Sequence, residues 1–241
     1  MRTDLYNLNL RSNVKSISEM TFRTDKYSLH PFKAEFGRKQ DDSNEDNTII
    51  FNSNGYIIEQ NKYKYDILLA EGHNYTLDDF HSEKWIFMYD DFNKKIEKIV
   101  TDKYLKSIRK EVFIYDTNKI IVKHFNEDFH YATIENLLDE YGRIVTKKTF
   151  EEGDFIGYRN FQYNSTHDLI KEVREEWAET TNFKYDEKRN LIEVEKLEDN
   201  KVCSTTIFKY KYDAFENWIE RVEFKNDKPI YITERKIEYY N

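Results

Sequence analysis

Two histidines and one aspartate stand close together in the middle of the sequence. His124, Asp128 and His130 would share one face if they stood on a single strand. Imidazole and carboxylate groups placed in this way can bind a transition metal. No second cluster at ligand spacing supports such a site, and residues 126–128 are typical of a turn. We therefore expect no metal site and no bound cofactor.

The other groups that could do chemistry lack the partners that chemistry requires. Cys203 is the single cysteine of the chain and lies outside any recognisable catalytic signature. Gly153 and Gly157 lack the Lys-Ser/Thr tail of a phosphate-binding loop. Carboxylates are abundant everywhere, so no catalytic pair stands out. We therefore expect a protein that is not an enzyme and has no catalytic residues.

A short repeated pattern is the main signal in the sequence. Each copy has an aromatic or large apolar residue, then Asp or Asn, then four turn-like positions, then an apolar pair or its near equivalent. The copies begin at Phe51, Tyr89, Tyr115, Leu138, Tyr163, Tyr185 and Tyr212. Residues 63–66 look like a decayed eighth copy. Self-similarity at this period indicates a repeat architecture.

The chemistry of one copy is that of a β-hairpin. Aromatic and β-branched residues alternate before the turn, as in residues 208–212, which favours a strand. The Asp or Asn side chain can hydrogen-bond the backbone two residues on, which opens a turn. Gly55 and Gly142 occupy the fifth position, where we expect a left-handed backbone. The other copies place Asn93, Lys119, His167, Arg189 and Glu216 there.

These units predict the whole fold. A lone hairpin is marginally stable in water, so the units must pair edge to edge. We predict an all-β fold in which tandem antiparallel β-hairpin repeats form an open curved sheet or partial barrel. Residues 1–241 are then a single repeat domain. Residues 1–50 supply an N-terminal cap and acidic loop, residues 51–224 the seven or eight repeats, and residues 225–241 a C-terminal cap strand.

In the copies that begin at Tyr185 and Tyr212, the chain resembles the rearrangement-hotspot, or YD-repeat, family. Residues 13–19 are similar to the opening segment of small YD-like proteins from Bacteroidetes-type bacteria. In large relatives, such repeats form a shell of spiralling hairpins around a toxin domain. Small stand-alone relatives are labelled sugar-binding or sit beside polymorphic toxins as immunity proteins. The resemblance is specific for architecture and nearly silent on activity.

Residues that interrupt the repeats are the better binding candidates, because the array does not require them. Exposed aromatic rings can stack on sugars or anchor a protein interface. The candidate binding residues are Trp177, Asp78, Asp79, Phe80, Glu151, Glu152, Asp154 and Phe155.

Composition limits the class of protein and its partners. The formal net charge is −8, which disfavours nucleic acid and favours a basic partner. No apolar run is long enough for a membrane helix, and the first residues do not form a secretory signal. We therefore expect a cytoplasmic protein with no membrane or nucleic-acid partner.

The leading hypothesis is a non-catalytic binding protein of the immunity type, which binds and neutralises a toxin, with a basic toxin domain as its protein partner. One alternative is a carbohydrate-binding YD-repeat protein at the cell surface. Another is a scaffold remnant of a larger toxin system.

Overall fold

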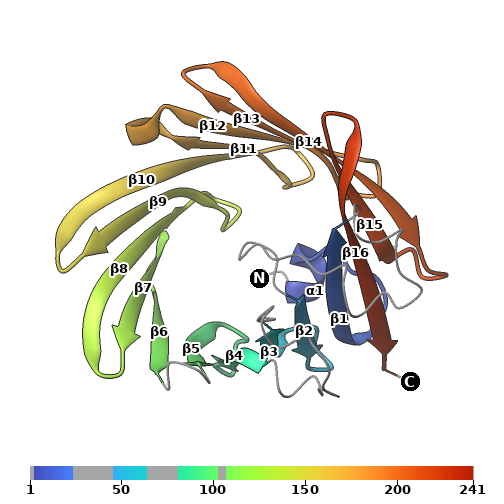
Figure 1. Cartoon of the computed structure of the whole chain (residues 1–241). Coiled ribbons are helices and arrows are strands. Elements are labelled where there is room, and N and C mark those ends of the chain that lie inside the picture. The colour runs from blue at the N-terminus through green and yellow to red at the C-terminus, as the bar shows by residue number, and fades with distance from the viewer. Residues whose placement is uncertain (1–2, 24–45, 64–80, 103–106, 241) are drawn as a thin grey trace, which may run out of the picture. The chain divides into compact units, whose positions relative to one another are not determined.

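A computed structural model describes residues 3–23, 46–63, 81–102 and 107–240 (Figure 1). Three candidate binding residues, Asp78, Asp79 and Phe80, lie outside the described residues. So do most of the decayed eighth copy and most of the acidic loop. Within the described part, no helix has the length and apolar character needed to cross a membrane.

Strands make up nearly all of the regular structure. In the described part of the chain, a short helix, α1 (Asp4–Asn7), precedes them, and a 3-10 turn, η3 (Glu175–Trp177), interrupts them. The strands are β1 (Val14–Arg23), β2 (Asp46–Phe51), β3 (Ile57–Tyr63), β4 (His81–Tyr89), β5 (Lys95–Asp102), β6 (Ile108–Tyr115), β7 (Lys119–Asn126), β8 (Phe129–Leu138), β9 (Ile144–Glu151), β10 (Asp154–Tyr163), β11 (Leu169–Arg174), β12 (Glu179–Tyr185), β13 (Leu191–Glu198), β14 (Lys201–Tyr212), β15 (Trp218–Lys225) and β16 (Lys228–Tyr239).

The strands pair in the order in which they occur in the chain. Each is hydrogen-bonded to its sequence neighbours, and the pairs are antiparallel (Figure 1). This confirms the predicted all-β array of tandem hairpins. The predicted open edge is wrong, because β1 pairs with both β2 and β16 and the strand order closes as a barrel. The physical reason is that β1 uses both of its edges, so neither end of the array is left unpaired.

The described chain divides into two compact units. Unit 1 comprises residues 87–99 and 107–207, and unit 2 comprises the other described residues. The main core of buried residues lies in unit 2, where Phe51 is fully buried. The residues of this core are Leu10, Val14, Ile17, Ile49 and Phe51.

In most copies the Asp or Asn side chain accepts from the backbone of its turn as predicted, whereas Asp116 Oδ1 accepts from the N–H of the next residue, Thr117. In the β4–β5 turn, Asp90 Oδ1 accepts hydrogen bonds from the backbone N–H groups of Phe92 and Lys94, at 2.9 and 2.8 Å. The β8–β9 turn repeats this arrangement around Asp139. One carboxylate oxygen therefore satisfies two backbone donors that a tight turn would otherwise leave free.

The fifth position has a left-handed backbone, also as predicted, in all but one copy. The residues with positive φ there are Gly55, Asn93, Gly142, His167, Arg189 and Glu216. The exception is Lys119, which begins β7 because the turn after Tyr115 is shorter: the N–H of Asp116 bonds directly to the carbonyl of Lys119 at 2.9 Å. That copy needs no left-handed residue at its fifth position.

Two of these glycines give a matched test of what the left-handed position costs. A Cβ on Gly55 would lie 2.9 Å from Leu5 Cδ1 of α1, whereas a Cβ on Gly142 would meet nothing within 4 Å. Gly142→Ala should therefore cost about 1 kcal/mol of unfolding free energy, from the backbone alone. Gly55→Ala should cost about 1–3 kcal/mol more, because the contact with Leu5 adds overpacking. Urea unfolding of the two variants measures the difference, and equal losses would contradict the packing argument.

The tyrosine that begins a copy links that hairpin to the one before it. Tyr115, Tyr163 and Tyr185 donate from their hydroxyls to backbone carbonyls in the seventh position of the preceding copy, at 2.8–2.9 Å. Burial, and then the charge of Asp168, raise the pKa of Tyr185 to about 12. The recurrence of tyrosine therefore follows from a bond that phenylalanine could not make.

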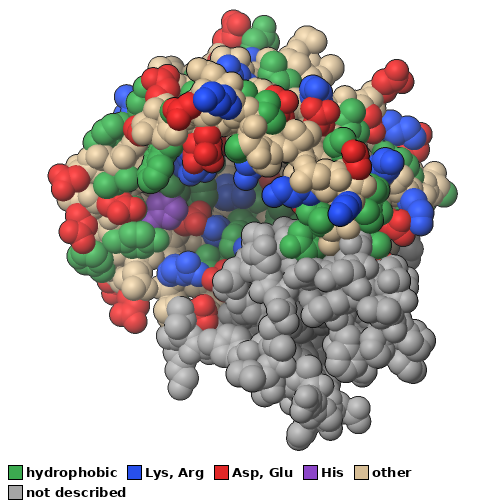
Figure 2. All heavy atoms as spheres, turned by 45° about the horizontal axis from the view of Figure 1, so that its top comes forward, with side chains coloured by type: hydrophobic (Ala, Val, Ile, Leu, Met, Phe, Trp, Pro, Cys, Tyr) green, Lys and Arg blue, Asp and Glu red, His purple; other side chains and the backbone are tan. Residues whose placement is uncertain are grey.

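Charged residues lie on both faces of the strands in unit 1. Lys147 and Lys148 are consecutive in β9 and so point to opposite faces, where they stand opposite Arg159 and Tyr158 of β10. Figure 2 shows Asp and Glu side chains interspersed with Lys and Arg over the described part of one face of the molecule.

One row of charges crosses the strands of unit 1. Lys98 Nζ of β5 lies 2.6 Å from Glu111 Oε1 of β6, and His124 Nδ1 of β7 lies 3.9 Å from the same oxygen. Further along, Arg159 of β10 pairs with Glu172 of β11 at 3.2 Å. Burial lowers the pKa of His124 below its usual value, although Glu111 opposes this effect. The neutral imidazole is therefore the form that the folded state favours.

The lowered pKa of His124 predicts a loss of stability in mild acid. The unfolded chain takes up this proton at a higher pH than the folded protein does. The contribution of the neutral His124 to stability is therefore fully present above about pH 6.5, and it is lost as the pH falls through the lower pKa of the folded state. Urea unfolding at about pH 7 and pH 5 should show a smaller loss in His124→Gln than in the wild type. An equal loss in His124→Gln and in the wild type would contradict the prediction.

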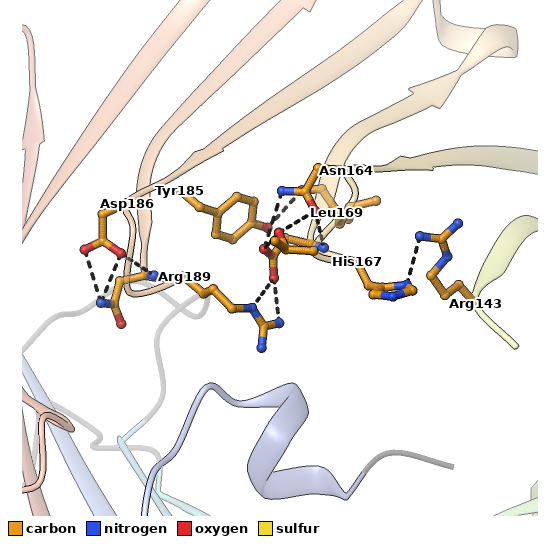
Figure 3. A network of polar contacts seen from close by, with 10 residues as sticks. Arg143, Asn164, His167, Leu169, Tyr185, Asp186 and Arg189 are labelled. Carbon is orange, nitrogen blue, oxygen red and sulfur yellow. Dashed lines mark hydrogen bonds and ion pairs between the residues drawn. The ribbon is translucent and has the colours of Figure 1, made fainter. Parts of the chain in front are cut away.

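Side chains also join the turns of neighbouring hairpins (Figure 3). Arg189 donates from Nε and Nη2 to Asp168 Oδ1 of the preceding turn, at 2.8 and 2.6 Å. His167 Nδ1 lies 3.2 Å from Arg143 Nη1 of the turn before that. In unit 2, Glu216 pairs with Arg11 at 2.5 Å. His167, Arg189 and Glu216 have a left-handed backbone, which is unfavourable for these residue types. Each of their side chains contacts a neighbouring segment, which glycine could not do.

Candidate functional site

A second set of turns joins the hairpins of unit 1 to one another. Because consecutive strands are antiparallel, the turns after β7, β9, β11 and β13 lie at the opposite strand ends from the Asp/Asn turns. Glu152 and Gly153, and then Asp199 and Asn200, are consecutive residues with positive φ. Such pairs form the tight two-residue turns that match the twist of antiparallel strands.

These turns are held together by backbone hydrogen bonds. The N–H of Glu127 donates to the carbonyl of Ile108 at 2.8 Å, and that of Glu152 donates to the carbonyl of Tyr131 at 2.9 Å. The N–H of Asp199 likewise reaches the carbonyl of Ala178 at 3.1 Å. Each turn is thus fixed to the strand ends of the preceding hairpin, and side chains on it are presented from a defined backbone.

Large apolar side chains are exposed at or next to these turns. Trp177 on η3 is 73% exposed, the highest value in this group. The exposed apolar residues here are Phe129, Phe155, Ile156, Trp177 and Val202. An indole left in water at a turn contributes nothing to the core, so the fold does not account for it.

The predicted candidates Phe155 and Trp177 stand on adjacent hairpins. The backbone N–H of Tyr158 in β10 donates to Glu176 Oε1 at 2.6 Å, and the Tyr158 hydroxyl donates to Glu175. This hydrogen bond raises the pKa of Tyr158. Glu175 and Glu176 therefore hold η3 against β10, which carries Phe155 near its start.

Phe155 is also held by its neighbours. Its ring centroid lies 5.7 Å from that of Phe150 with the rings edge to face, and 6.4 Å from that of Tyr158 with the rings stacked. Both separations are within the range of favourable aromatic pairs. Phe155 is therefore an exposed ring in a fixed orientation, which lowers the entropy that binding would cost.

Carboxylates stand on the same turns as the exposed apolar residues. We define the acidic tip as the turns of unit 1 at residues 126–129, 151–156, 174–179 and 198–202. Its carboxylates are Glu127, Asp128, Glu151, Glu152, Asp154, Glu175, Glu176, Glu179, Glu198 and Asp199. Arg174 and Lys201 are the basic residues in the same ranges. The acidic tip thus combines exposed apolar rings with a strong local excess of negative charge.

Five of the binding candidates predicted from the sequence lie on these turns. The structure places Glu151, Glu152, Asp154, Phe155 and Trp177 in the acidic tip. The exposed Phe129, Ile156 and Val202 were not singled out. The sequence carries no signal that distinguishes them, because an apolar residue near a turn can be buried or exposed.

The other groups considered for chemistry are not arranged for it. A bulge between β7 and β8 puts His124 opposite Ala132 and His130 opposite Phe125, so the two imidazoles lie on different faces. The two histidines do not stand on a single strand, because the chain reverses between them at the turn expected over residues 126–128. Among the described residues, no three His, Cys, Asp or Glu side chains are placed to hold a metal. Cys203 is exposed, and its Sγ donates to the carbonyl of Lys196.

Comparison with known proteins identifies no family. No family model matches the chain, and no curated protein matches it. Among solved structures, a porin-like protein from Bacteroides uniformis is similar over 95% of this chain and 99% of its own, with a TM-score of 0.56 and 9% identity. At this identity, the similarity shows the fold alone.

Chains of Tc toxins are also structurally similar. The Photorhabdus luminescens Tc holotoxin pore matches 79% of this chain with a TM-score of 0.31 and 12% identity. The TcdB2-TccC3-Cdc42 structure matches 89% with a TM-score of 0.30 and 11% identity. This chain spans only 12% and 13% of those two chains. Such weak matches carry no argument about function, and the YD-repeat resemblance stays a prediction from the sequence.

Proposed function

We propose that this chain is a non-catalytic binding protein that captures a basic protein at the acidic tip, as an immunity protein captures a toxin. The exposed indole of Trp177 is the observation that carries the proposal. Tryptophan is enriched among the residues that dominate binding energy at protein interfaces. Large exposed apolar groups ringed by charge are typical of such surfaces.

The charge of the acidic tip supports a basic partner. Its carboxylates outnumber its basic residues by a wide margin, and the whole chain has a formal net charge of −8. Complementary charge steers encounter and raises the association rate. Apolar contact with Trp177 and Phe155 would then set how long the complex lasts.

The proposal includes a cytoplasmic location. The description as porin-like applies to the matched protein, which has 9% sequence identity with this chain. Strands that face lipid need an apolar face, and a lysine or arginine there costs about 2–4 kcal/mol at the centre of the bilayer. Lys147 and Lys148, on opposite faces of β9, support a protein whose strands contact water or protein instead.

Trp177→Ala is expected to weaken binding of a toxin domain encoded beside this gene by about 30-fold, which is about 2 kcal/mol. The indole is removed, and η3 keeps its contacts with β10 through Glu175 and Glu176. Calorimetric titration of the purified proteins measures the change. Co-expression with the toxin should restore growth with the wild type but not with Trp177→Ala.

Phe92→Ala is the matched control, because Phe92 is 81% exposed but lies in an Asp/Asn turn away from the acidic tip. It should leave both binding and rescue unchanged. Changing Glu151, Glu152 and Asp154 to their amides should slow association and reduce its dependence on salt. Full rescue by Trp177→Ala, or a neighbourhood without any toxic gene product, would contradict the proposal.

Carbohydrate binding is the second candidate, and the same exposed indole favours it. Trp218 is buried, and Trp85 lies under Lys62 Nζ at 4.3 Å, so Trp177 offers the free ring face among the described tryptophans. A glycan panel should then shift the tryptophan fluorescence of the wild type and not of Trp177→Ala. Flat titrations would remove this candidate.

A further inference from the structure

A buried ion pair lies on β1 and β16 in unit 2. Arg235 donates from Nε and Nη2 to Glu19 Oε1, at 2.9 and 2.6 Å. The side chain of Arg235 is only 8% exposed. Asn47 Nδ2 of β2 donates to the other oxygen, Glu19 Oε2, at 2.8 Å. The carboxylate of Glu19 is therefore well supplied with donors.

A second guanidinium group lies close to this pair. Arg221 of β15 stands opposite Thr233, two residues before Arg235 on β16. Its Cζ lies 5.4 Å from the ring centroids of both Trp218 and Phe208, while Arg235 Cζ lies 3.3 Å from the Trp218 ring. Trp218 thus contacts both guanidinium groups. Among the described residues, Glu19 is the carboxylate that forms an ion pair with Arg235 in this cluster.

Two donors in this cluster have no acceptor. Arg221 Nε and Arg235 Nη1 are buried, and neither makes a hydrogen bond within the described structure. An unpaired buried donor costs about 1–3 kcal/mol, and more when the group is charged. The cluster also holds two positive charges against one negative charge. A bound anion would supply both the hydrogen-bond acceptors and the negative charge that the cluster lacks.

We propose that the cluster of Glu19, Arg221, Arg235 and Trp218 binds a carboxylate group, with its oxygens accepting from Arg221 Nε and Arg235 Nη1. A carboxylate has two oxygens for the two free donors, and its single negative charge balances the cluster. A phosphate dianion would add more charge than the cluster lacks. This site is independent of the acidic tip, which lies in unit 1.

Calorimetric titration with sodium acetate, against sodium chloride at equal ionic strength, tests the site in the whole protein. We expect saturable binding with a dissociation constant on the order of 1 mM. Arg221→Gln should weaken binding at least about tenfold, because it removes the Nε donor and one charge. Arg159→Gln is the matched control, because Arg159 is a paired surface arginine of unit 1 and should leave binding unchanged.

Two further measurements distinguish between possible anions and control for misfolding of the Arg221→Gln variant. Sodium glucuronate that binds more tightly than acetate would indicate a sugar acid, and equal binding would indicate a simple carboxylate. Arg221→Lys keeps the charge but not the guanidinium donor, and it should weaken acetate binding even if Arg221→Gln fails to fold. No saturable binding of acetate or glucuronate, tighter binding of inorganic phosphate, or undiminished binding in a folded Arg221 variant would overturn the proposal.

Discussion

Phe51→Ala should lower the unfolding free energy of the protein by about 3–5 kcal/mol. Phe51 is 0% exposed, and it packs with Val14, Ile17 and Ile49 in the core at the start of β1 and end of β2. Removing the ring deletes buried apolar area and leaves a cavity that these β-branched neighbours fill poorly. Urea unfolding followed by circular dichroism measures the loss as a lower midpoint.

Phe92→Ala makes the same chemical change in a side chain that is 81% exposed. It should alter stability by no more than about 0.5 kcal/mol. A loss at Phe51 as small as the loss at Phe92 would show that Phe51 is not part of a packed core.

Arg235→Met should cost about 3–5 kcal/mol, because it leaves the carboxylate of Glu19 buried without its cation. Burial raises the pKa of Glu19, but the charge and hydrogen bonds of Arg235 outweigh it, and the pKa of Glu19 is lowered overall. The pair therefore stabilises the wild type above the pKa of the unfolded glutamate, and this stability is lost as the pH falls through the lower folded pKa.

The matched variant is Glu19→Leu with Arg235→Met, which removes both charges at once. It should recover part of the stability that Arg235→Met loses, because no carboxylate is left buried without Arg235, although the charge of Arg221 remains. Chemical unfolding at neutral pH compares the three proteins. If Arg235→Met alone were as stable as the wild type, Glu19 would not depend on Arg235 for its charge.

The hairpins could be predicted because their information is local. Each copy carries its own turn residues, such as Asp90 and Asp139, and its own alternating strands, so one copy predicts the next. The shorter turn before Lys119 was not predicted, because its first residues match the other copies and the hydrogen bond between Asp116 and Lys119 is seen only in the structure. The general form was predictable, and the exception was not.

The closure of the strand order could not be predicted in the same way. It depends on pairs such as Glu19 with Arg235 and Thr21 with Thr233, which are separated by more than two hundred residues. Each of these strands alternates polar and apolar residues like many others in the chain. Nothing in such a pattern selects one distant partner over another.

The candidate site was predicted through its exceptions to the repeat. Trp177 and Phe155 stood out because the hairpins do not need them, and both are exposed in the structure. Phe129 and Val202 were missed, because an apolar residue beside a turn can be buried or exposed, and spacing does not decide which. The net charge of −8 also gave no position, since a sum over the whole chain does not say where the carboxylates lie.

The two-sided pairing of β1 has a consequence for how the protein is made. On the ribosome, β2 emerges soon after β1, but the partner for the other edge of β1, β16, lies 216 residues further along at the Glu19–Arg235 pair. At ordinary rates of translation this is a delay of roughly 10–40 s. During that time the nascent chain presents one unpaired strand edge, so a trigger-factor-type holdase that shields it should raise the yield of folded protein.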